Sequence, residues 1–149
     1  MSHQHPPHQC VNCCDAIPPT VLRYSINTTG YALCISCQDK LRFKLKYTTR
    51  ETAKLYFLLR QRGIAAELER YDGFKNVDIA ISHSKVNIEV DRPNKTYNHH
   101  KAVAELERTF YSFETGFFKL NIPNELVAYD HADAVNFIEQ FIKVNTNVH

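Results

Sequence analysis

Three carboxylates on two short apolar runs are the side chains of this sequence with the clearest capacity for chemistry. Asp78 lies in the run 77–81, and Glu89 and Asp91 lie in the run 86–91. Both runs have strand character, and because strand residues i and i+2 share a face, Glu89 and Asp91 should point the same way. Carboxylates beside an apolar core are costly unless they are compensated, and a divalent cation such as Mg²⁺ would compensate them. The alternative is that the acids lie at a sheet edge and face water.

Four cysteines in two CxxC pairs form a second candidate site. Cys10 and Cys13 are separated by twenty residues from Cys34 and Cys37. Two such knuckles can place four thiolates around one Zn²⁺ ion with no position left open, so the ion would stabilise the fold and take no part in catalysis. A helix expected after Cys37 favours a treble-clef arrangement over a zinc ribbon. Cys14 could replace Cys13, and the alternatives for the whole set are disulfides or free buried thiols.

Positive charge gathers between Lys40 and Arg62, although the chain of 149 residues has a net charge of only +2. This stretch contains eight basic residues and one acid, Glu51. Lys and Arg supply the salt-dependent attraction to phosphates, so the stretch is a candidate nucleic-acid contact. A solvated helix face is the alternative. The nucleic-acid-binding residues that we expect are Arg42, Lys44, Lys46, Arg50 and Lys54.

Composition indicates a globular protein. Apolar residues make up 44% of the sequence, which is enough for a core. No apolar run approaches the roughly 18 residues of a membrane span, and the N-terminus lacks the charged and apolar regions of a secretion signal. We therefore expect a cytoplasmic protein without a membrane partner. In the reducing cytoplasm, paired cysteines bind metal more often than they form disulfides.

The elements that must position these residues are predicted by periodicity and turn chemistry. A hairpin is expected over residues 21–33 because residues 27–30, Asn-Thr-Thr-Gly, favour a turn. The next helix should begin with Thr48 as N-cap and Glu51 at its third position, and should end at Gly63. Strands at 65–69, 77–81, 86–91 and 117–122 and helices over about 99–113 and from 130 or 132 onward complete the order α, β, β, β, α, β, α.

Within the helix expected over about 99–113, the apolar residues recur at helical spacing and form one stripe, which consists of Val103, Leu106, Phe110 and Phe113. These patterns divide the chain into a disordered tail (1–9), a zinc-binding module (10–46) and a larger domain (47–149).

From about Thr48 to Val144 the sequence resembles the PD-(D/E)XK nuclease superfamily, and within it the group of very-short-patch-repair endonucleases. The matching pieces are a helix with Glu51, the two acid-bearing strands, the run 116–120 and a final helix. The resemblance implies an α/β (α+β) restriction-endonuclease-like fold, with a mixed central sheet flanked by helices. It also implies DNA phosphodiester cleavage that depends on Mg²⁺ or Mn²⁺, with Asp78 and Glu89 holding the metal, Asp91 in the third motif position and Glu51 supporting the site.

One position departs from the pattern of that superfamily. The third motif residue is usually Lys, and here it is Asp91. The cation that orients water or stabilises charge at phosphorus is therefore missing from its usual place. Residues that could supply it are His99, named here as a candidate catalytic residue, together with His100, Lys101, Lys85 and Lys95; simple exposure of the His pair at a helix start is the alternative.

These observations predict a metal-dependent DNA endonuclease with a structural zinc module, which would act as a homodimer if it cuts both strands. The alternative function is a non-catalytic nucleic-acid-binding or interaction module that keeps the nuclease fold.

Overall fold

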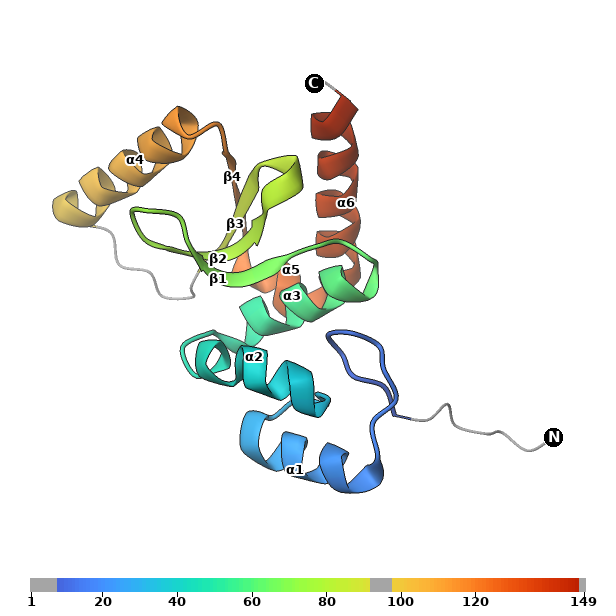
Figure 1. The fold of residues 1–149 in the computed structure, drawn as a ribbon. Helices are drawn as coiled ribbons and strands as arrows, with labels where there is room; N and C mark the ends of the chain where they lie inside the picture. The colour runs from blue at the N-terminus through green and yellow to red at the C-terminus, as the bar shows by residue number, and fades with distance from the viewer. Residues whose placement is uncertain (1–7, 92–97, 148–149) are drawn as a thin grey trace.

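The computed structural model describes residues 8–91 and 98–147, and a four-stranded mixed sheet forms its centre (Figure 1). The sheet has the strand order β1-β2-β3-β4; its first three strands form an antiparallel meander and the fourth pairs with the third in parallel. The strands are β1 (Glu67–Tyr71), β2 (Asn76–Ile81), β3 (Val86–Val90) and β4 (Phe118–Ile122). The prediction of a mixed α/β fold with a central sheet flanked by helices is confirmed.

Helices precede, interrupt and follow the sheet. The helices before it are α1 (Pro19–Thr29), α2 (Ile35–Leu45) and α3 (Arg50–Gln61). The one-turn helix η1 (Ser82–Ser84) joins β2 to β3, and α4 (His99–Glu114) lies between β3 and β4. The chain continues after β4 with α5 (Asn124–Tyr129) and α6 (His131–Asn147). The predicted order of elements after the cysteine module is recovered, with η1 and α5 as short additions. Within the described residues, every helix is too short or too polar to cross a membrane.

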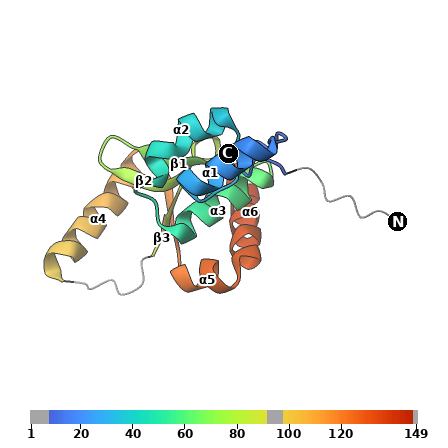
Figure 2. The same cartoon turned by 90° about the horizontal axis from the view of Figure 1, so that it is seen from below.

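The sheet has one apolar and one polar face, as the alternation along its strands requires. On the apolar face, Ile79 and Ile81 of β2 are fully buried, and they belong to the core that α3, α5 and α6 share. Helix α4 lies on the other side of the sheet from α6, as both views show (Figures 1 and 2). The residues of β2 and β3 between the apolar ones, which include Asp78 and Glu89, therefore face α4 and solvent.

Helix α4 turns its polar side toward the sheet. The apolar stripe that predicted this helix is present but exposed, with side chains between 39% and 80% exposed at Val103, Leu106, Phe110 and Phe113. Glu105 and Arg108 are half-buried and Ser112 is buried on the opposite side of the helix. This orientation brings charged groups of α4 over the polar face of the sheet.

The hairpin predicted over residues 21–33 is wrong, because most of that segment is α1. Pro19 opens the helix, and Gly30 ends it with a φ of 82°, which are typical positions for the two residues. The hydroxyls of Thr28 and Thr29 donate to carbonyls one turn earlier, so the polar threonines are accommodated within a helix. The residues that suggested a turn are therefore the last turn of α1 and its stop.

Helix α3 begins one residue later than expected. Thr49 is the N-cap and its Oγ1 accepts from the N–H of Thr52 at 3.2 Å, so the capping box centred on Thr48 is wrong. Thr48 instead donates its hydroxyl to the carbonyl of Lys44 (2.8 Å) and to Oε1 of Glu69 on β1 (3.3 Å). The helix ends before Gly63, as predicted, where φ is 79°.

One hydrophobic core crosses from the N-terminal helices into α3. Leu33 and Leu41 belong to the same buried cluster as Leu55 of α3. The rings of Tyr31 and Phe57 also meet across this contact, with centroids 5.0 Å apart. Residues 1–7 of the expected tail lie outside the described residues. The proposed domain division at residues 46 and 47 thus falls within a continuous core.

Candidate functional site

A row of polar side chains crosses all four strands on the polar face of the sheet. Glu89 of β3 is directly opposite Asn121 of β4. The neighbouring pairs of β1 and β2 place Glu69 opposite Asp78, and the β2–β3 register, continued one residue beyond Ile79 and Ile88, places Asp78 level with Glu89. All four residues line one cavity of about 330 Å³. Like charges opposite each other destabilise a sheet, so three carboxylates in one row need positive charge nearby.

Asp78 is held where β2 and β3 separate. The β2–β3 ladder reaches only as far as the pair Ile79 and Ile88. Beyond it, the N–H of Val90 donates to Oδ2 of Asp78 at 2.9 Å, so a side chain replaces the backbone acceptor. The Asp78 carboxylate is thereby fixed at the mouth of the gap between the strands.

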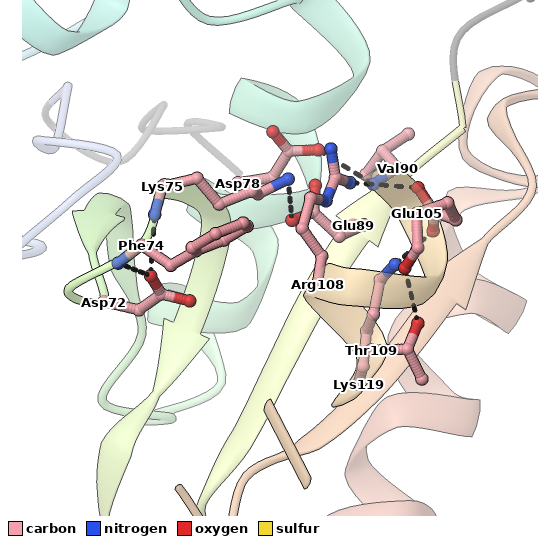
Figure 3. A network of polar contacts seen from close by, with 10 residues as sticks. All are labelled: Asp72, Phe74, Lys75, Asp78, Glu89, Val90, Glu105, Arg108, Thr109 and Lys119. Atoms are coloured by element: carbon pink, nitrogen blue, oxygen red, sulfur yellow. Dashed lines mark hydrogen bonds and ion pairs between the residues drawn. The ribbon is translucent and has the colours of Figure 1, made fainter. Parts of the chain in front are cut away.

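Lys75, which directly precedes β2 in the β1–β2 hairpin, brings positive charge to the carboxylate row. Its Nζ is 2.8 Å from Oε1 of Glu89, and the two side chains are 24% and 14% exposed (Figure 3). Burial, and next the negative charge of Asp78, raises the pKa of the Glu89 carboxyl, while Lys75 acts in the opposite direction. The net upward direction means that Lys75 does not offset the combined effect of burial and of Asp78 on the pKa of Glu89.

The hairpin turn that carries Lys75 is fixed by its own aspartate and by α4. Asp72 Oδ1 accepts from the N–H groups of Phe74 and Lys75, both at 2.8 Å. Tyr111 of α4 donates its hydroxyl to the carbonyl of Asp72 at 3.0 Å and stacks on Phe74. Gly73 has a φ of 99°, and a Cβ built there would be 2.5 Å from the Tyr111 hydroxyl oxygen. The turn therefore requires glycine and keeps Lys75 over the sheet.

Helix α4 brings a second set of charges to the cavity. Arg108 lines the cavity and forms an ion pair with Glu105, one turn earlier, at 3.2 Å. Glu105 also forms an ion pair with Lys119 of β4 (Figure 3). Arg108 is thus anchored at the cavity wall with its cationic group toward the carboxylate row.

The residues predicted for the acidic site are brought together only in part. Asp78, Glu89 and Asp91 line the same cavity. Glu51 does not line it: it lies in the first turn of α3, where its charge acts on the phenol of Tyr31. His99 is exposed at the start of α4 and is also not among the residues that line the cavity.

Those residues considered for the missing cation that the structure describes do not line the cavity of the carboxylates. His100 and Lys101 are exposed in the first turn of α4, and Lys85 is in the β2–β3 turn, beyond the far end of those strands. Lys95 lies outside the described residues. Among the described residues, the cations that line the cavity are Lys75 and Arg108. The sequence could have indicated Lys75, because it follows the Asp-Gly turn and precedes Asp78 by three residues.

The expected nucleic-acid contacts follow α2 into α3. Arg42, Lys46 and Arg50 are exposed, and Lys44 and Lys54 are half-buried. Tyr47, within this basic stretch, lines the same cavity as the carboxylate row.

The four predicted cysteine ligands form a compact cluster. The sulfur atoms of Cys10, Cys13, Cys34 and Cys37 all lie within 4.8 Å of one another, and in the described part of the chain this is the one group of His, Cys, Asp or Glu with such geometry. All are free thiols, and the 3.7 Å between the sulfurs of Cys13 and Cys34 exceeds the roughly 2.05 Å of a disulfide. Cys14 is exposed and outside the cluster.

The cluster can hold a structural zinc ion. Cys34 is the N-cap of α2 and its sulfur accepts from the N–H of Cys37, as a treble-clef arrangement requires. Backbone N–H groups of Cys34, Cys13 and Asn12 outweigh burial and lower the pKa of Cys10 to about 7. Burial instead raises the pKa of the Cys13 and Cys37 thiols, so a thiolate is favoured at Cys10, and Cys13 and Cys37 would lose their protons as a zinc ion binds.

A buried hydrogen-bond relay ties this cluster to α3. The side-chain amide of Asn12 donates to the sulfur of Cys37 at 3.2 Å, and the hydroxyl of Tyr56 on α3 donates to Oδ1 of Asn12 at 2.7 Å. Asn12 and Tyr56 are 7% and 4% exposed. Such partners orient metal ligands from behind.

Among known proteins, the likeness is structural. No family model matches the chain, and no curated protein matches it significantly. A solved structure titled "Homing Endonuclease I-Bth0305I Catalytic Domain" superposes with a TM-score of 0.52 and 17% sequence identity, covering 66% of this chain and 98% of that one. At this identity the likeness establishes a shared fold.

Proposed function

We propose that this protein is a metal-dependent endonuclease of PD-(D/E)XK type that hydrolyses phosphodiester bonds of DNA. The observation that carries the proposal is the carboxylate row, which places Glu69, Asp78 and Glu89 on the wall of one cavity beside Lys75 and Arg108. The fold shared with the catalytic domain of a homing endonuclease supports it. The basic stretch along α2 and α3 would attract the DNA backbone.

The donor set fits Mg²⁺ or Mn²⁺. Mg²⁺ is usually bound by one or two carboxylates, with water and phosphate oxygens filling its other positions. Asp78, oriented by the Val90 N–H, and Glu89 would be those ligands. The raised pKa of Glu89 supports this assignment, because a bound cation would stabilise its charged form. Asp91 and Glu69, which line the same cavity, could hold metal-bound water.

The residues around the row would position the phosphate. A bound ion would polarise the phosphate and lower the pKa of the attacking water. Lys75 contacts Glu89 directly and would supply the cation that Asp91 does not. Arg108, anchored by Glu105, would stabilise negative charge as it develops on the phosphate. The four cysteines would hold zinc for the fold alone, since all four positions around the ion are filled by protein.

The test is nicking of supercoiled plasmid by the zinc-loaded full-length protein with added Mg²⁺ or Mn²⁺. Asp78→Asn keeps an acceptor for the Val90 N–H but removes the charge, and we expect at least an approximately 100-fold loss of rate, as for Glu89→Gln. Glu114→Gln, at the exposed end of α4, is the matched control and should cleave normally. Undiminished nicking by Asp78→Asn would overturn the proposed site. Direct linearisation would indicate a homodimer acting on both strands.

The second candidate function is a non-catalytic module that binds nucleic acid. The ion pair between Lys75 and Glu89 favours it, because a lysine already occupies part of the space that a metal would need. This function predicts salt-dependent DNA binding without cleavage under any divalent metal. Cleavage that is lost in Asp78→Asn would exclude it.

A further inference from the structure

Two exposed aromatic rings lie together at the end of α2. Phe43 and Tyr47 are 69% and 68% exposed, and their ring centroids are 5.4 Å apart at an interplanar angle of 62°. Single exposed apolar side chains are common and need no explanation. Two adjacent rings within a run of cations are less ordinary, because aromatic faces beside Lys and Arg form the surfaces on which proteins stack unpaired bases.

Positive charge surrounds this aromatic pair. Between Lys40 and Arg50 the sequence has five basic residues and no acid. Phe43 lines a hollow of about 170 Å³ together with Arg42, Lys46 and Asp39. The cations can contact phosphates on either side of a base that lies against the rings. A bound polyanion is therefore better matched to this surface than an apolar partner.

The aromatic pair is joined to the carboxylate row. Tyr47 lines the same cavity as Asp78 and Glu89. The next residue, Thr48, donates its hydroxyl to Oε1 of Glu69, which belongs to the row. A base that stacks on the Tyr47 ring would therefore lie next to the cavity that contains the row, with its own phosphates close by.

We propose that Phe43 and Tyr47 form a stacking platform for unpaired bases. It follows, if the proposed nuclease function holds, that the substrate class is nucleic acid with a single-stranded segment next to the scissile phosphate. Bases inside a duplex are already stacked on their neighbours and their faces are not available to the rings. Free single strands, frayed ends and branched junctions present such faces, and perfect duplexes do not.

Binding can be measured separately from cleavage. The zinc-loaded full-length protein is titrated, without added Mg²⁺, into a single-stranded oligonucleotide that contains the fluorescent base 2-aminopurine, and into a blunt duplex of equal charge. The chain has no tryptophan, so protein fluorescence interferes little. Stacking quenches 2-aminopurine, so wild-type protein should reduce the signal of the single strand.

The variants give the decisive comparison. Phe43→Ala and Tyr47→Ala should each weaken single-strand binding about ten-fold and remove the quenching, with little effect on the duplex. Tyr47→Phe should bind normally, because the ring and not the hydroxyl stacks. Tyr129→Ala, which removes a tyrosine that is 88% exposed at the end of α5, is the matched control and should have no effect.

Each outcome of these titrations shows whether the surface formed by Phe43 and Tyr47 binds unpaired bases. Unchanged single-strand binding in both alanine variants, or an equal loss on duplex, would overturn the platform even if plasmid nicking succeeds. Binding of neither oligonucleotide at low salt would also overturn it and leave the surface to a protein partner. Loss of binding and quenching in the variants of a protein that cleaves nothing would support the platform and reject the nuclease function alone.

Discussion

Removal of Lys75 should destabilise the protein through Glu89. Lys75→Met keeps the aliphatic length and deletes the charge that lies 2.8 Å from the Glu89 carboxylate. Exposed ion pairs contribute about 0–1 kcal/mol, whereas breaking a buried pair costs about 3–5 kcal/mol. The side chains of this pair are 24% and 14% exposed, which lies between the two cases, so we expect a loss near 2 kcal/mol. For a chain of this size, such a loss lowers Tm by about 4–8 °C.

The loss should depend on pH. Burial and the charge of Asp78 raise the folded-state pKa of Glu89 above its ordinary value of 4.5, and Lys75 opposes that rise. An acid with a raised pKa favours the folded state at low pH, and this contribution is lost as pH rises through the folded-state pKa. Without Lys75 the pKa rises further. The difference between wild type and Lys75→Met should therefore be largest at about pH 8 and should shrink toward about pH 4, where Glu89 is protonated.

Urea unfolding at several pH values, followed by circular dichroism on zinc-loaded protein, measures this difference. Glu89→Gln in the Lys75→Met background should recover about 1–2 kcal/mol at about pH 8, because the uncompensated charge is gone. If Mg²⁺ binds the same carboxylates, it should stabilise Lys75→Met by about 2.7 kcal/mol at a hundred times its Kd, which is enough to offset the loss. An equal loss at both ends of the pH range, with no coupling between the two substitutions, would refute the reasoning.

Three further substitutions test other parts of the structure. Tyr56→Phe removes the donor to Oδ1 of Asn12, so it should lower the free energy of unfolding in urea by about 1–3 kcal/mol. It should also speed the loss of zinc to a chelator, measured with a colorimetric zinc dye, and unchanged zinc release would argue against the relay. Gly73→Ala should cost about 1–3 kcal/mol, because it strains a left-handed φ and crowds the Tyr111 hydroxyl; unaltered Tm would mean that the turn can shift freely. Ile88→Ala, in a fully buried position on β3, should cost about 2–5 kcal/mol in the same unfolding assay, and a loss below about 1 kcal/mol would place this residue outside the core.

Strand alternation and cysteine spacing carried most of what could be predicted from the sequence. The period of two around Asp78 and Glu89 predicted both strands and the shared face of their acids, because these runs are buried on one side. The two CxxC pairs predicted a four-cysteine cluster that the structure brings together. Both signals are local, and so they need no knowledge of how distant segments pack.

The sequence predictions failed or were incomplete where tertiary contacts determine the local structure or the position of a side chain. The turn chemistry of residues 27–30 favoured a hairpin, but Pro19 and Gly30 mark the two ends of a helix that packs against α2. Glu69 comes next to Asp78 only through the register of β1, and Arg108 reaches the cavity only because α4 turns its polar side inward. An apolar stripe on a helix normally indicates the side that faces the core. No sequence pattern indicated that the apolar stripe of α4 faces outward.

The core that runs from α2 into α3 limits how this chain could be rearranged in evolution or in the laboratory. A break between residues 46 and 47 would expose Leu41 on one fragment and Leu55, Tyr56 and Phe57 on the other, all at most 6% exposed in the intact chain. Fragments with such surfaces tend to aggregate before they fold. We expect that the cysteine module cannot be transferred to another protein unless the residues of α3 that pack against it are transferred as well.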